Sequence, residues 1–216
     1  NTKLAGYIFN ELAFSELTRA QVAGRIEQAD LGGTFPTFIP EVFDLPVDPA
    51  AIGPATAVNR HFTPKSGSIG LIQNLPGELV ASITAQYVER APKPAELFSG
   101  GAHHATETFD KGNPNLGIET AKSIELGLRR AAGPVRFELT GYYTQYSGFI
   151  YRRLTGNTCE DVACVGSADP AYPLELNQAI YSQRDATFRG GEFQSQLDIG
   201  PLNSGIWGVE NQFDVV

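Results

Sequence analysis

The chain has 216 residues and a formal net charge of −8, which argues against nucleic acid as a partner. Its 23 Gly, 14 Pro, 13 Phe and 8 Tyr fit a packed globule poorly. No stretch reaches the roughly 18 consecutive apolar residues of a transmembrane helix. This excludes membrane-spanning helices but not membrane β-strands, because such a strand needs only about ten residues of alternating character.

Alternation of apolar and polar residues predicts eight strands in chain order. The expected strands cover residues 4–14, 20–27, 61–75, 79–88, 123–129, 135–144, 174–199 and 207–213. The clearest is residues 135–144, where Val135, Phe137 and Leu139 alternate with charged or hydroxyl-bearing residues. Gly190 and Gly191 inside the seventh strand predict a β-bulge.

The connections between these strands alternate in length. Short turns are expected near residues 15–17, 76–78, 132–134 and 200–203. Long irregular loops are expected at about 32–57, 91–118 and 155–172, where prolines or turn residues interrupt the pattern. Short turns at one end and long loops at the other predict an antiparallel up-and-down meander, the layout of outer-membrane barrels.

The two faces of the expected strands differ in character. One is apolar with aromatic residues near its ends, as a lipid-facing band requires, and the other carries charged and amide side chains, as a wet lumen allows. Eight strands could close a small barrel. However, the last strand ends without an aromatic residue, so we expect part of a larger transmembrane barrel. The chain has no methionine and no signal peptide, so we also expect a mature or internal piece of a protein.

The loop at residues 91–118 holds the candidate metal ligands His103, His104, Glu107 and Asp110. Imidazole and carboxylate groups suit Zn²⁺ and related divalent ions. Adjacent residues of an extended segment point to opposite sides, whereas a helical segment would put His103 and Glu107 on one face. The other interpretation is a polar loop without a metal.

The two cysteines, Cys159 and Cys164, lie five residues apart in the third long loop. We expect a small disulfide ring in an oxidising compartment. Free thiols or a metal pair are the alternatives. On the loop-entropy model, so short a ring would stabilise the protein by about 2 kcal/mol.

Four short motifs follow one another along the chain. The first is an R-A-P-…-E-L-F loop formed by Arg90, Pro92, Glu96, Leu97 and Phe98. The others are the G-N-P return at Asn113 and Pro114, the E-L-G-L-R strand with Glu125 and Gly127, and the R-G-x-E strand with Arg189, Gly190 and Glu192. In this order and spacing, over about residues 60–216, the motifs together resemble the barrel of TonB-dependent outer-membrane receptors.

The resemblance implies a bacterial outer-membrane nutrient receptor with a barrel of about 22 strands and a plugged lumen. We expect contact with outer-membrane lipid, a small nutrient ligand, and TonB through a plug domain. Residues 1–216 lack the plug domain and the C-terminal barrel strands of that family. The run after His104 is similar to a zinc- and heme-uptake branch, so the implied cargo is a metal ion or metal chelate, with zinc weakly favoured; no cofactor is required.

An enzymatic function is not predicted, because the chain has no nucleophile elbow, no His-Glu-x-x-His pair and no phosphate-binding loop. The alternative function is a secreted β-sandwich module for adhesion or carbohydrate binding. A sandwich would bury its apolar face against a second sheet. A membrane barrel would expose it.

Overall fold

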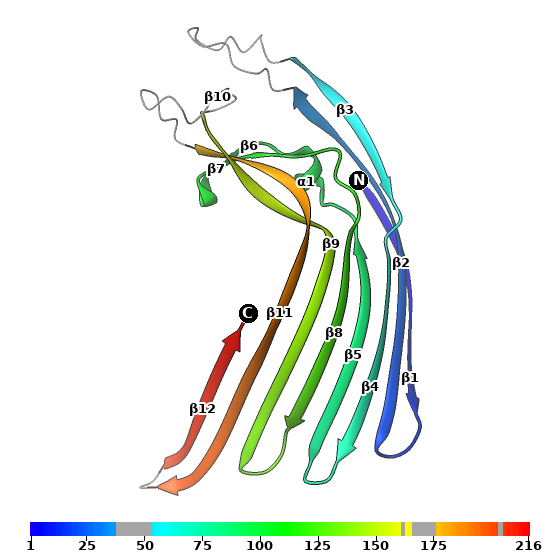
Figure 1. The fold of residues 1–216 in the computed structure, drawn as a ribbon, viewed down its shortest axis with the longest axis vertical. Coiled ribbons are helices and arrows are strands. Elements are labelled where there is room, and N and C mark those ends of the chain that lie inside the picture. Colours follow the sequence, from blue (N-terminus) through cyan, green and yellow to red (C-terminus); the bar gives the residue numbers. More distant parts are fainter. Residues whose placement is uncertain (38–52, 161–162, 166–175, 203–204) are drawn as a thin grey trace.

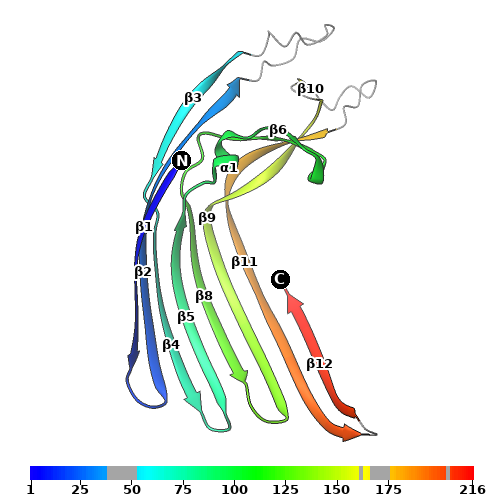
Figure 2. The same cartoon turned by 180° about the vertical axis from the view of Figure 1, so that it is seen from behind.

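Long antiparallel strands run side by side in one curved sheet (Figures 1 and 2). This computed structural model describes residues 1–37, 53–160, 163–165, 176–202 and 205–216. Eight strands form the wall: β1 (Thr2–Ala13), β2 (Thr18–Thr37), β4 (Lys65–Leu75), β5 (Leu79–Arg90), β8 (Glu119–Arg130), β9 (Val135–Glu160), β11 (Leu176–Leu202) and β12 (Gly205–Val215). Each pairs with the next along the chain, so the predicted eight-strand meander is confirmed.

Shorter elements gather at one end of this wall. They are β3 (Gly53–Phe62), α1 (Pro94–Phe98), β6 (Gly100–His103), a 3-10 turn (His104–Thr106), β7 (Thr108–Lys111) and β10 (Ala163–Val165). Tight turns connect the wall strands at the opposite end (Figure 1). No helix among the described residues is long and apolar enough to cross a membrane.

Three expected loops are in fact partly regular, which corrects the sequence analysis. Residues 32–37 and 53–57 extend β2 and β3, which pair with each other, and the register shifts between Phe35 and Thr37. This irregularity accommodates Pro36, which has no backbone donor. The rest of that loop, residues 38–52, lies outside the described residues. The loop at 155–172 begins as strand, because β9 continues to Glu160 and pairs with β10.

The segment between β5 and β8 contains a helical turn and a small hairpin where one long loop was expected. β6 pairs with β7, and β7 pairs with β11 in parallel over Asn177–Ile180, a departure from the purely antiparallel prediction. β7 and β12 occupy the same edge of β11 at different heights. The predicted strand at 61–75 is also split, because Thr63 and Pro64 separate β3 from β4.

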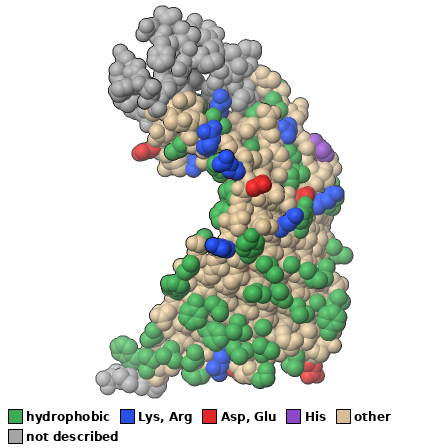
Figure 3. Space-filling view, in the orientation of Figure 1, with side chains coloured by type: hydrophobic (Ala, Val, Ile, Leu, Met, Phe, Trp, Pro, Cys, Tyr) green, Lys and Arg blue, Asp and Glu red, His purple; other side chains and the backbone are tan. Residues whose placement is uncertain are grey.

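The two faces of the sheet have opposite chemistry. On the outer face, cross-strand neighbours are apolar, as in the row Leu71, Ile83 and Leu126. These side chains are exposed, Leu126 at 56%. On the inner face the same strands present polar side chains such as Thr84 and Glu125, which are paired in register. Figure 3 shows the hydrophobic side chains gathered over the lower half of the molecule.

A single described sheet with an exposed apolar face does not support the β-sandwich alternative, which needs a second sheet over that face. Among the described strands, β1 and β12 do not pair with each other, so the wall is open. The arrangement is that of part of a β-barrel, in which apolar residues face lipid and polar residues face the lumen.

The described hydrophobic core is small and lies at the end of the wall that carries α1. Its members are Ala29, Leu31, Phe62, Ala91, Leu97, Leu116 and Ile150. Residues 29 and 31 share the inner face of β2 with Arg25 and Glu27, so α1 packs on the inner side of the wall. The core therefore holds the connection at residues 91–118 against the inner face rather than letting it project outward.

Candidate functional site

The inward-folded connection between β5 and β8 forms the candidate functional site, here called the inner rim (residues 91–118). The ends of the wall that carry the long connections are the extracellular ends in outer-membrane barrels. The rim therefore lies where an external ligand would arrive. Its geometry rests on the motif residues singled out in the sequence.

Arg90, the last residue of β5, connects two carboxylates. Its guanidinium donates to Glu96 Oε2 at 2.8 Å and to Glu119 Oε2 at 3.0 Å. Glu96 and Glu119 are buried. Burial disfavours the charge on Arg90, but the hydrogen bonds that the guanidinium donates to Glu119 and Glu96 outweigh burial and raise its pKa. The arginine thus ties the end of β5, helix α1 and the start of β8 together.

Glu96 also organises the helical turn that follows. Its carboxylate accepts the backbone N–H of Lys93 at 2.7 Å, which satisfies a donor at the start of α1. Pro94 occupies the first turn, where its missing N–H costs nothing. Glu119 accepts the backbone N–H of Ile150 at 2.7 Å, which links the rim to β9.

The G-N-P return is packed tightly against α1. A Cβ on Gly112 would come within 2.6 Å of the Leu97 carbonyl carbon, so the close approach requires glycine. The backbone N–H of Asn113 donates to the Glu96 carbonyl at 2.9 Å, and its side-chain amide donates to the Tyr181 carbonyl at 3.2 Å. Arg60 of β3 donates to the backbone carbonyls of Pro114 and Leu116.

Leu97 and Pro92 are fully buried, and Phe98 packs against the core and over Gly33. The R-A-P-…-E-L-F and G-N-P motifs therefore hold the rim in place. The structure places their side chains in ion pairs, caps and core contacts rather than on a free ligand-binding surface.

A chain of polar contacts crosses the other half of the rim. Arg152 of β9 donates to Asp110 Oδ2 at 3.3 Å, and Thr108 donates to Asp110 Oδ1 at 2.8 Å. Thr106 is 2.8 Å from the Thr108 hydroxyl and 2.8 Å from His103 Nδ1. These contacts connect the buried carboxylate of Asp110 to the exposed imidazole of His103.

The described side chains among the predicted metal ligands, those of His103, Glu107 and Asp110, do not form a group that could hold a metal ion. The segment holding His103 and Glu107 is a β-hairpin with a 3-10 turn, so the helical arrangement of these two residues is wrong. Asp110 is paired with Arg152. Among the described residues no group of three His, Cys, Asp or Glu side chains could hold a metal ion. The side chain of His104 lies outside the described residues, so the full metal set remains a prediction.

Thr108 of the rim, and Gln178 and Tyr181 of β11, were missed as site candidates in the sequence analysis, whereas Asp110 was named there as a metal ligand. Thr108, Asp110 and Gln178 are buried because β7 adds to the edge of β11. Tyr181 packs against the core, and burial together with the nearby Asp110 raises the pKa of its phenol. Local spacing carries no signal for this parallel pairing, since about 70 residues separate the two segments.

The remaining motif residues lie on the wall. Glu125 and Glu192 are on the inner face, paired with Tyr142 and Thr140. The β11–β9 register runs without a shift through Gly190 and Gly191, so the predicted bulge is wrong; a Cβ on Gly190 would collide with the Val215 carbonyl and the Tyr142 hydroxyl. A Cβ on Gly127 would come within 2.5 Å of Ser82 Oγ. These glycines therefore keep space for neighbouring groups.

The cysteines lie at the β9–β10 hairpin. Cys159 is fully buried and disulfide-bonded, and the register places Cys164 opposite it. Cys159 also neighbours Leu176 of β11.

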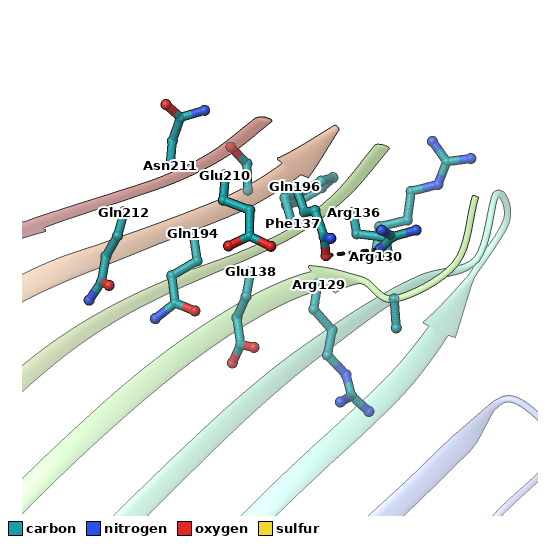
Figure 4. A pocket seen from close by; sticks show the side chains of 12 residues that line it. Arg129, Arg130, Arg136, Phe137, Glu138, Gln194, Gln196, Glu210, Asn211 and Gln212 are labelled. Atoms are coloured by element: carbon teal, nitrogen blue, oxygen red, sulfur yellow. Dashed lines mark hydrogen bonds between the residues drawn. The ribbon is translucent and has the colours of Figure 1, made fainter. Parts of the chain in front are cut away.

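A polar hollow lies on the inner face at the opposite, turn-bearing end of the wall (Figure 4). Arg136 donates two hydrogen bonds of 2.7 Å to Asp198 and one of 3.3 Å to Gln196. Glu138, Gln194 and Glu210 extend the lining across β9, β11 and β12. The hollow has charges of both signs, so it is suited to contact a polar surface.

Known proteins share this architecture. The family model described as TonB dependent receptor-like, beta-barrel, matches residues 1–215. A structure of the hemophore receptor HasR of Serratia marcescens with its hemophore HasA and heme has 16% identity over 92% of this chain and a TM-score of 0.59. The copper transporter OprC has 16% identity over 91% of this chain and a TM-score of 0.63. The siderophore receptor PirA from Pseudomonas aeruginosa has 15% identity over 99% and a TM-score of 0.51.

This chain spans 32%, 26% and 42% of those three proteins, respectively. At sequence identities this low, the structural similarity supports the fold and nothing more. The family match covers nearly the whole chain, and the wall has the outer apolar band and polar inner face of an outer-membrane barrel. The chain therefore belongs to the family of TonB-dependent receptors and forms part of their β-barrel in the outer membrane of Gram-negative bacteria.

Proposed function

We propose that this chain forms part of the wall and extracellular rim of a receptor that imports a scarce nutrient. The energy would pass from TonB through a plug domain in the lumen. The observation that carries the proposal is the inner rim itself. A connection that folds inward and is fixed by Arg90 narrows the mouth of the lumen, whereas a purely structural wall needs no such fixed element.

The ligand class that the rim favours is a metal chelate. Asp110 is already paired with Arg152, so this carboxylate is not free to hold a bare cation. The half-exposed Arg152 and the exposed His103 are instead accessible to solvent and can offer N–H groups to a ligand. Such donors suit the carboxylate or phenolate oxygens of an anionic chelate. HasR is described in complex with heme, OprC as a copper transporter and PirA as a siderophore receptor, which agrees with a metal-containing cargo.

Bare zinc is the second candidate, since His103 and His104 lie next to each other at the tip of the rim. Zinc titration of the intact receptor, with His103→Ala and His104→Ala variants, separates the two candidates. Unchanged zinc affinity in both variants would remove the zinc proposal and leave the chelate proposal standing.

The polar hollow of Figure 4 would face the plug domain, because it lies on the inner face at the end opposite the rim. Its arginine, glutamate and glutamine side chains suit a hydrated and separable contact. Under this proposal the protein is a transporter.

The test is growth of a Gram-negative strain in which the gene encoding this chain supplies the sole receptor for the nutrient offered. Heme, ferric siderophores, copper and zinc are supplied one at a time under metal limitation. We expect one chelate to support growth, and the growth to disappear when TonB is inactivated. Uptake that persists without TonB would contradict the proposal.

A further inference from the structure

Strands β9 and β11 do not run straight to the mouth. Both follow the wall from the turn-bearing end and then bend toward the inner side of the sheet (Figures 1 and 2). Their register shifts between Arg184 and Ala186, where Ser147 and Gly148 of β9 lie opposite Asp185 alone. This arrangement is a β-bulge, which bends the strand that carries the extra residue. The bulge therefore accounts for the bend.

The backbone of the bulge depends on a glycine and on two side chains of β11. Gly148 has a φ of 67°, in the left-handed region that glycine adopts without steric cost. Its N–H donates to Asp185 Oδ1 at 2.9 Å, and its carbonyl accepts from Gln183 Nε2 at 2.8 Å. A Cβ on Gly148 would lie 3.0 Å from the same Nε2 atom. Both polar groups of the Gly148 backbone are thus held by side chains.

Gln183 also joins the bulge to the inner rim. The backbone N–H of Gly117 donates to Gln183 Oε1 at 2.7 Å, and Gln183 Nε2 donates to the Gly117 carbonyl at 3.1 Å. One amide group therefore bonds both the bulge and the last part of the rim. Any change in the angle of the strands above the bulge would break these bonds.

An aromatic contact spans the bulge. The ring of Phe149, directly above it, packs against Tyr146 and Phe188, with centroids 5.0 and 5.4 Å away. Tyr146 lies on the polar inner face, four residues from Tyr142 in a β8–β9 register that has no shift. Apolar contacts are non-directional, so these rings can shift against one another without breaking a hydrogen bond.

The strands above the bulge carry half of the rim with them. Residues 149–160 of β9 and 176–184 of β11 are here called the arm. β7 is paired with the arm at Asn177–Ile180, and Arg152 of the arm donates to Asp110 of β7 at 3.3 Å. The β6–β7 hairpin and the arm therefore form one unit.

This unit has narrow connections to the rest of the molecule. The hairpin leaves the rim between Ser99 and Gly112, which are joined by one backbone hydrogen bond of 2.7 Å. The bond from the Ile150 N–H to Glu119 lies only two residues from Gly148, so a turn about the bulge would move it little. The α1 half of the rim, by contrast, is held to β5 and β8 by Arg90.

We propose that the arm pivots at the Gly148 bulge and that Gln183 and the Phe149 ring hold it in its inclined position. A turn of the arm would carry Arg152 and the β6–β7 hairpin across the mouth, while α1 stays with the wall. The use of this movement, to admit a nutrient, rests on the proposed function. The pivot itself is a property of the strand pair.

The test measures the bend in the intact receptor in detergent, without any nutrient. Spin labels are placed at Leu139→Cys below the bulge and at Leu154→Cys in the arm, both exposed positions, and are read by double electron–electron resonance. In a straight strand the labelled Cα atoms would be about 50 Å apart, because each residue rises about 3.3 Å. We expect the otherwise unchanged receptor to give one narrow distribution at a shorter distance.

The release variant combines Gln183→Leu and Phe149→Ala, which remove the amide link and the ring contact. The matched control makes the same two changes away from the bulge, with Gln194→Leu and Phe213→Ala. We expect the release variant to add a second component that extends toward about 50 Å, and the control to keep the single distribution. A release variant without the second component, or the same component in the control, would overturn the proposal.

A milder variant keeps the test decisive if the release variant does not fold. Gln183→Glu has the same size, but its carboxylate cannot donate to the carbonyls of Gly148 and Gly117. We expect the longer component in Gln183→Glu and not in Gln194→Glu, and equal distributions in the two would overturn the proposal. Since no nutrient is present, failure of this test would leave the proposed import standing, and failure of import would leave the pivot standing.

Discussion

Gly112 shows at the scale of one residue how the rim is held. A Cβ at this position would lie 2.6 Å from the Leu97 carbonyl carbon and 2.7 Å from the Phe98 nitrogen, both backbone atoms that cannot rotate away. We expect Gly112→Ala to destabilise the rim by about 1–3 kcal/mol, the range for overpacking. Gly101→Ala, in the neighbouring hairpin with no atom within 4 Å, is the control. Limited proteolysis within residues 91–118 measures the difference, and equal cleavage of the two variants would refute it.

Arg90 gives a second prediction, because one guanidinium serves two buried carboxylates. Arg90→Lys keeps the charge, but an ammonium cannot reproduce the forked contacts with Glu96 and Glu119. We expect faster hydrogen exchange of the α1 and β7 amides. Breaking a buried ion pair typically costs about 3–5 kcal/mol, and the loss in Arg90→Lys should be smaller because the lysine keeps part of the pairing. Arg129→Lys on the exposed inner wall is the control. Unchanged exchange at α1 in Arg90→Lys would show that the motif does not hold the rim.

The pKa of Tyr181 predicts how the rim responds to alkali. Burial and Asp110 raise this pKa above the value of a free phenol, which is also its value in the unfolded chain. The stability that results is present below the unfolded pKa near 10 and is lost as the pH rises from there through the folded pKa. We expect Tyr181→Phe, which has no phenol to ionise, to weaken this alkaline loss of rim protection. Proteolysis between pH 8 and pH 11 would show it, and identical profiles for variant and wild type would contradict it.

At the scale of elements, β9 and β10 form a hairpin whose closure is held by Cys159. We expect no maleimide labelling of the folded or unfolded protein unless it is first reduced. The double variant Cys159→Ser and Cys164→Ser should be less stable by about 2 kcal/mol, because the closed ring is short. Labelling of the oxidised, unfolded protein would contradict the pairing. A single Cys159→Ser variant is the control that leaves one reactive thiol.

The elements also show what the sequence could and could not predict. The eight wall strands follow from alternation, because each has one face toward lipid and one toward the lumen. The rim was missed as structure because Pro92 and Pro94 indicate a break but carry no signal for the helical turn they begin. The parallel addition of β7 to β11 depends on residues far apart in the chain. The metal prediction rested on residue types alone, and the Arg152 partner of Asp110 lies 42 residues away.

At the scale of the whole molecule, the apolar band on the outer face and the polar side chains on the inner face determine which face of the sheet contacts lipid. Both faces are exposed in this open wall, so exposure alone does not distinguish them. The register does distinguish them, because apolar side chains are paired across neighbouring strands, as from Leu71 through Ile83 to Leu126, while Thr84 and Glu125 form a polar row beside them. The loss of alternation on one strand would therefore affect the whole band.

Arginine scanning tests this assignment by depth. Leu126 lies four residues from the turn end of β8, near the middle of the band, whereas Tyr143 lies eight residues from the turn end of β9, near the outer edge of the band. We expect Leu126→Arg to cost about 2–4 kcal/mol and Tyr143→Arg about 0–1 kcal/mol, because the penalty for a cation falls toward the interface. Glu125→Arg, next to Leu126 but on the inner face, should stay near the wild type. Unfolding of the receptor from detergent-solubilised membranes measures all three, and a larger loss for Glu125→Arg than for Leu126→Arg would reverse the two faces of the wall.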